Sequence, residues 1–134
     1  MDLAHRHTVG GWCMLSAFIA LGLILEALLA FKVGAYLDEA AELRREMWTL
    51  AHAHGTLLSL VHIAFAAYVK NRSFDAAPFV SVALFLAVVL MPVGFLLAGA
   101  FPYEGDPGSG IWLVPLGGVS LLSGSVAVAW DSLR

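Results

Sequence analysis

The amino-acid sequence predicts an all-α integral membrane protein that folds as one four-helix up-down bundle. Hydrophobic residues make up 60% of its 134 residues and charged residues only 13%, whereas soluble domains carry about 25% charged residues. The apolar residues gather into four runs, each close to the ~20 residues that a helix needs to cross a bilayer. These runs are residues 11–33, 47–69, 77–101 and 111–130, and with their short connections they fill a single transmembrane domain of residues 1–134.

The first run has Glu26 as its only charged residue before Lys32. A signal peptide is the alternative for this segment, since His5, Arg6 and His7 resemble the basic start of one. The run is about twice as long as the 7–15 apolar residues of a signal peptide. We therefore expect a membrane span that is retained.

The other three runs are also typical of membrane helices. The second has sharp charged edges and contains three histidines, His52, His54 and His62. Pro92 lies within the third and most apolar run, where the missing backbone donor predicts a loosened or kinked helix. Pro115 lies in the first turn of the fourth run, a position where proline is tolerated.

The connections differ in character. In residues 34–46, apolar residues recur at helical spacing among charged ones. This pattern predicts helical extensions at the membrane interface, with a pair of solvated helix ends as the plainer alternative. Residues 102–110 contain two prolines and three glycines, which predict an irregular turn.

Small residues form a stripe along each of the last two runs, and such stripes let membrane helices pack closely. The stripes are Ala83, Ala87, Gly94 and Ala98 on the third run, and Gly117, Ser120, Gly124 and Ala127 on the fourth. Tryptophans near span ends act as interface anchors. Those near the expected ends are Trp12, Trp48, Trp112 and Trp130. Both features favour a compact bundle.

The charges limit the kinds of partner. The net charge is −3 and no basic cluster occurs, which argues against nucleic acid and against polybasic lipid anchoring. The expected partners are the lipid bilayer and either a second copy of the chain, giving a homo-oligomer, or another membrane protein. Basic residues are slightly more numerous on the side of the termini, so we expect both termini in the cytoplasm. Cys13 is the single cysteine and forms no intramolecular disulfide.

Glu26 and His54 are ionisable residues inside apolar runs. A charge at membrane depth costs at least ~2.5 kcal/mol and by default marks a functional site. If the chain reverses near Ala40, the two residues stand at matching depth on antiparallel helices. We therefore predict a Glu26–His54 pair that binds or passes a proton, an ion or a small polar ligand, or supports assembly with a partner. A purely structural clasp is the alternative.

The three histidines of the second run point in different directions. At about 100° per residue, His52 and His54 lie about 160° apart and His62 about 80° from each, so they cannot all bind one metal ion. We expect His52 at the membrane interface, and His62 near the bilayer middle as a neutral imidazole and part of the ligand or proton site. Its predicted hydrogen-bond partner is one of three serines, Ser16, Ser120 or Ser123.

A membrane redox protein is the alternative function. Haem or another metal would be bound by His54 or His62, with a link to quinone chemistry. The Glu-x-x-His motif of carboxylate-bridged metal bundles does not occur.

No Ser/His/Asp or Cys/His order that would indicate an enzyme stands out, and no glycine-rich loop follows a strand. The sequence therefore favours a protein without enzymatic activity.

Three short segments resemble motifs of a known family. They are Leu21-Gly22 in the first run, His54-Gly55-Thr56-Leu57-Leu58 in the second, and residues 113–122 with Pro115, Gly117 and Gly118 in the fourth. Together they resemble a family of small four-span membrane proteins known as domain of unknown function 423.

That resemblance implies four spans, a location such as the bacterial inner membrane, and a polar site between the first two helices. Members of the family typically have Gly-Ala-His late in the first helix. This chain reads Leu25-Glu26-Ala27 there, so a carboxylate stands beside the position of a histidine.

Overall fold

The computed structural model of the chain describes residues 2–70 and 72–134 and is all-α. Helix α1 (Leu3–Ala30) is followed by the short helix α2 (Gly34–Leu37), a 3-10 turn (Glu39–Ala41) and helix α3 (Glu42–Lys70). Helix α4 (Ala77–Ala100), a second 3-10 turn (Ser109–Trp112) and helix α5 (Leu113–Ser132) come next. By length and composition, α1, α3, α4 and α5 with its preceding turn are suited to crossing a membrane. The predicted all-α four-helix bundle is confirmed.

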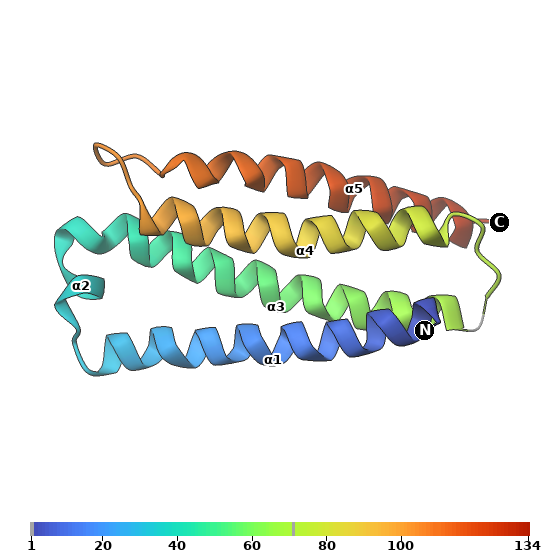
Figure 1. The fold of residues 1–134 in the computed structure, drawn as a ribbon, viewed down its shortest axis with the longest axis horizontal. Helices are drawn as coiled ribbons and strands as arrows, with labels where there is room; N and C mark the ends of the chain where they lie inside the picture. The colour runs from blue at the N-terminus through green and yellow to red at the C-terminus, as the bar shows by residue number, and fades with distance from the viewer. Residues whose placement is uncertain (1, 71) are drawn as a thin grey trace.

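The four long helices run alternately in opposite directions, so both ends of the chain lie at the same end of the bundle (Figure 1). We call this the terminal end, and the opposite end, which holds α2, the loop end. Helix α1 packs along α3, α3 along α4, and α4 along α5. Within the described residues, no Cα atom of α1 lies within 8 Å of one in α5. The bundle is therefore an open layer with α1 and α5 outermost.

Two helices begin earlier than the expected spans. Helix α1 begins at Leu3 rather than near residue 11, because buried Ala4, His7 and Gly11 continue its helical stripe toward the N-terminus. Helix α3 begins at Glu42 rather than near residue 47, and Glu42 puts a negative charge at the positive end of the helix dipole. Helix α4 remains one helix across Pro92.

The connection between α1 and α3 folds onto the loop end. Tyr36 in α2 is only 4% exposed, and its ring stacks on that of Trp48 with 6.4 Å between centroids. Arg44 in α3 donates to the carbonyl oxygens of Ala35 and Gly99. These contacts join α2, α3 and the end of α4, so this segment is packed rather than simply solvated.

Glycines set the distance between α1 and α3. A Cβ atom at Gly11 would lie 2.7 Å from Cγ1 of Ile63 and 3.1 Å from the carbonyl oxygen of Ser59. A Cβ atom at Gly55 would collide with the ring of Phe18. Because side chains cannot occupy such positions, the two helices approach this closely only through glycine.

Candidate functional site

A hydrogen-bonded chain of three buried side chains joins three helices near the terminal end. Nδ1 of His7 in α1 lies 2.8 Å from Nδ1 of His62 in α3. Nε2 of His7 lies 2.8 Å from Oγ of Ser81 in α4. His7 is 0%, His62 1% and Ser81 4% exposed. Both ring nitrogens of His7 are thus hydrogen-bonded to side chains of other helices.

The positions of these residues along their helices explain why they meet. His7 and Ser81 each lie about one turn after the start of α1 and α4. Helix α3 runs the other way and brings His62 to the same level about two turns before its end at Lys70. At ~1.5 Å per residue, His7 and Ser81 lie about 6 Å from their helix starts. The three hydrogen-bonded side chains therefore lie in the half of the bundle toward the terminal end.

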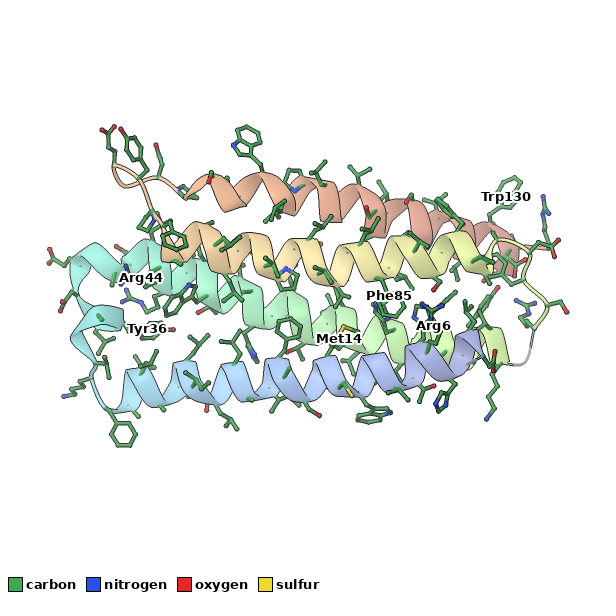
Figure 2. The ribbon with its side chains drawn as sticks, in the orientation of Figure 1. Arg6, Met14, Tyr36, Arg44, Phe85 and Trp130 are labelled. Carbon is green, nitrogen blue, oxygen red and sulfur yellow. The ribbon has the colours of Figure 1, made fainter. Side chains whose placement is uncertain are left out.

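Two phenylalanines enclose the histidine pair. The rings of His7 and His62 are stacked, with 4.7 Å between their centroids. The Phe65 ring lies 4.8 Å from that of His7, and the Phe85 ring lies 4.7 Å from His7 and 4.6 Å from His62. Arg6 lies beside Phe85, with its Cζ atom 6.0 Å from the ring centroid (Figure 2). The imidazoles are thus shielded by aromatic rings, with one cation close by.

The hydrogen-bonded chain has two neutral arrangements, because each neutral imidazole carries one N–H. In the first, His62 donates from Nδ1 to His7, and His7 donates from Nε2 to Ser81. In the second, Ser81 donates to Nε2 of His7, and His7 donates from Nδ1 to His62. Nε2 of His62 has no hydrogen-bond partner in the structure. One arrangement converts into the other when one proton enters at one end of the hydrogen-bonded chain and one leaves at the other end, at Oγ of Ser81 and Nε2 of His62, so the chain is neutral before and after.

A groove of about 530 Å³ lies beside these three side chains, between the start of α1 and residues 78–90 of α4. Arg6 and Ser81 provide its polar groups. Its remaining wall is apolar and includes Leu3, Val82, Leu86, Val89 and Leu90. The groove therefore suits an amphipathic molecule whose polar group meets Ser81 and Arg6.

The structure corrects the prediction for His62. Its hydrogen-bond partner is His7 rather than a serine. The serines instead donate to carbonyl oxygens of their own helices, Ser16 to Trp12, Ser120 to Leu116 and Ser123 to Ser120. His7 itself is absent from the predicted site, because the first span was expected to begin after it.

Glu26 and His54 are not brought together. Nδ1 of His54 lies 2.9 Å from the carbonyl oxygen of Leu50 in its own helix, and its ring lies 4.9 Å from that of Phe95 in α4. Glu26 is exposed on α1 and lines a hollow of about 230 Å³ together with His52. Depth alone placed Glu26 opposite His54, but the rotation of α3 turns His54 toward α4.

Of the two neighbouring histidines His52 and His54, His52 is the one that faces α1. Its Nδ1 lies 2.7 Å from the carbonyl oxygen of Phe18, and a Cβ atom at Gly22 would collide with its ring. A carbonyl oxygen only accepts, so the hydrogen is on Nδ1 and the neutral ring keeps a free lone pair on Nε2. The bond from His54 to the carbonyl of Leu50 has the same consequence.

Metal-binding groups do not cluster in the described residues, where no three His, Cys, Asp or Glu side chains gather at one point. A metal or haem would therefore depend on single histidines. His52 and His54 each have the free Nε2 and the backbone-bonded Nδ1 that ligating histidines usually show.

The small residues of α4 and α5 lie where these helices meet. A Cβ atom at Gly94 would lie 3.0 Å from Cγ2 of Val114, and one at Gly117 2.5 Å from Cγ of Met91. A Cβ atom at Gly124 would lie 3.4 Å from that of Ala83. Ser120 is half-buried on the same helix.

No protein-family model matches the chain, and no match was found among curated proteins or solved structures. The resemblance to domain of unknown function 423 therefore stays a prediction.

Proposed function

We propose that this four-span membrane protein binds a small amphipathic ligand beside Ser81 and passes a proton along the chain Ser81–His7–His62. The observation that carries this proposal is His7, a fully buried imidazole bonded through both nitrogens to side chains of two other helices. Polar side chains at membrane depth are costly and mark functional sites by default. A structural clasp between two helices needs only one such hydrogen bond. Here His7 makes a second hydrogen bond, to Ser81, which lines the groove.

The ligand class follows from the groove. A guanidinium and a hydroxyl at one wall favour an anionic or carbonyl oxygen, since Arg6 donates hydrogen bonds and Ser81 both donates and accepts. The apolar remainder favours a hydrocarbon chain. A protonated ligand oxygen that gives a proton to Ser81 passes one on to Nε2 of His7; His7 then gives its Nδ1 proton to His62, and His62 releases a proton from Nε2.

Nitrogen NMR on the histidine-labelled protein in lipid nanodiscs tests this function. We expect a coupling across the hydrogen bond between the Nδ1 nuclei of His7 and His62. Addition of decanoate, a single-chain carboxylate, should shift the ring signals of His7. In Ser81→Ala the coupling should persist while the shift on addition of decanoate is lost.

His5 is the internal control, since it lies in the same turn of α1 and is exposed. Its signals should show no coupling and little response to decanoate. The proposal fails if the His7 signals lack the coupling or respond to decanoate no more than those of His5.

A haem- or metal-binding redox protein is the second candidate, supported by the free Nε2 atoms of His52 and His54. Haem ligation would require one of these nitrogens to reach the iron from the bundle surface. A Soret band after expression with added haem, lost in His54→Ala or His52→Ala and kept in His5→Ala, would support it. A colourless protein under these conditions would count against it.

The location belongs to the same proposal. We place the chain in a bacterial inner membrane with both termini in the cytoplasm, as a homo-oligomer or with another membrane protein. The charges that support this orientation are Arg6, Lys70, Arg72 and Arg134 at the terminal end, against Lys32, Arg44 and Arg45 at the loop end.

A further inference from the structure

The three buried side chains have the order and spacing of a hydrolytic triad, with His62 in the place of the usual carboxylate. We propose that Ser81 is a nucleophile, His7 its general base and His62 the residue that positions His7, and that together they hydrolyse a long-chain acyl ester held in the groove. This inference rests on the proposed function, since it uses the same three hydrogen-bonded side chains, and adds a covalent reaction to it.

The distances fit this assignment. A nucleophile and its base should lie about 2.6–3.2 Å apart, with a third group orienting the base. Oγ of Ser81 lies 2.8 Å from Nε2 of His7, and Nδ1 of His7 lies 2.8 Å from Nδ1 of His62. The second neutral arrangement has the required direction, because Ser81 donates to His7 and His7 donates to His62.

The surroundings of His7 keep its imidazole in the neutral form that can accept a proton. The ring is fully buried, with the rings of Phe65 and Phe85 at 4.8 and 4.7 Å, and burial disfavours a charged imidazole. Arg6 lines the same groove as Ser81 and is exposed. A guanidinium there can turn toward the negative oxygen that develops on an attacked ester carbonyl.

The depth of the site points to the substrate class. Ser81 lies about 6 Å from the start of α4, by the ~1.5 Å rise per residue, which is near the boundary between headgroups and hydrocarbon. The ester groups of membrane amphiphiles lie at this boundary. The apolar wall of Leu3, Val82, Leu86 and Val89 would receive the acyl chain.

The reaction balances with water as its only co-reactant. Oγ of Ser81 bonds to the ester carbonyl carbon while its proton passes to Nε2 of His7. The bond from that carbon to the alcohol oxygen then breaks, and the alcohol leaves with the proton from His7. Water attacks the acyl-serine, gives a proton to His7, and the fatty acid leaves as Oγ of Ser81 recovers a proton.

A fluorophosphonate with a decyl chain tests this reaction on the full chain in nanodiscs. We expect a covalent adduct on Ser81, identified by mass spectrometry, and hydrolysis of p-nitrophenyl decanoate. His7→Gln should slow both by at least about 100-fold, the lower end of a general-base contribution. Ser81→Ala should abolish both. Ser16→Ala and His5→Gln are the matched controls and should label and react as the wild type does.

His62 requires a readout that distinguishes positioning from packing. In His62→Asn the amide oxygen can stand where Nδ1 stood and accept from His7, whereas in His62→Leu no acceptor is present. We expect the asparagine variant to retain labelling and the leucine variant to lose it, even where both show helical circular dichroism and a cooperative melt.

The outcomes separate this inference from the proposed function. Absence of an adduct on Ser81 in a wild-type sample that shows the His7–His62 coupling overturns the hydrolase inference and leaves the binding proposal standing. Labelling of Ser81 that is equal in wild type and His7→Gln overturns the role of His7 as base.

Discussion

At the scale of single residues, the imidazole of His7 links the first helix to two others. It bonds His62 on one side and Ser81 on the other and has no exposed surface. Its position follows a stripe that can be read in the sequence, since Ala4, Gly11 and Leu15 share its face at helical spacing. It was not among the predicted site residues, because the first span was expected to begin at residue 11, whereas α1 begins at Leu3.

Replacement of His7 should therefore destabilise the bundle. In His7→Leu the volume is largely kept, but His62 and Ser81 lose their partner and remain buried. We expect a loss of ~1–3 kcal/mol, the cost of leaving buried polar groups unpaired. Thermal unfolding in detergent measures it. The exposed neighbour His5 provides the control, and a His5→Leu variant as unstable as His7→Leu would contradict this role.

The surroundings of Glu26 lead to a prediction about a different histidine from the one the sequence suggested. Glu26 and His52 line the same hollow, whereas His54 packs on Phe95. We expect Glu26→Gln to shift the ring signals of His52 in nitrogen NMR and to leave those of His54 nearly unchanged. A larger shift at His54 would restore the pairing first predicted from depth. The sequence predicts how deep Glu26 and His54 lie in the membrane. It does not predict which neighbour each side chain faces, because that depends on the rotation of α3 against α1 and α4.

At the scale of helices, hydrophobic runs located all four spans but not all of their ends. Helices α1 and α3 begin earlier than expected. Their first turns are amphipathic, and an average of hydropathy over a window does not detect such turns. Close packing between α1 and α3 depends on which glycines face the partner helix. Gly10 and Gly11 are adjacent in sequence, yet only Gly11 lies against the backbone of α3.

These two glycines form a matched pair for mutation. A Cβ atom at Gly11 would lie 2.7 Å from Ile63 Cγ1, whereas one at Gly10 would lie an ordinary 3.5 Å from Phe85. Gly11→Ala should destabilise the protein by ~1–3 kcal/mol through overpacking. Gly10→Ala should be neutral or stabilise by up to ~1 kcal/mol, since alanine is the better helix former. Melting temperatures in detergent compare them, and equal effects would show that α1 and α3 do not meet at Gly11.

At the scale of the whole molecule, the bundle is an open layer whose outer helices expose apolar faces. Ile19 and Leu23 of α1 are 48% and 62% exposed, and Val119 and Leu122 of α5 are 67% and 64% exposed. Lipid tails would cover these faces in a bilayer. The polar chain near the terminal end is then reached along the α1–α4 groove from one membrane surface, so the orientation of the bundle decides which compartment it communicates with.

Cysteine labelling of the intact protein tests that orientation. The native Cys13 is replaced by serine, and a single cysteine is placed either at Ser73, in the exposed connection between α3 and α4, or at Asp106, in the exposed turn before α5. Because the four long helices alternate in direction, these connections should lie on opposite sides of the membrane. The excess of basic residues at the terminal end predicts that Ser73→Cys faces the cytoplasm. A membrane-impermeant maleimide should therefore label Asp106→Cys in intact cells and Ser73→Cys only in inverted vesicles. Labelling of both from the same side would contradict four crossings, whereas exchange of the two would keep the fold and place the groove and its Ser81–His7–His62 chain near the outer surface.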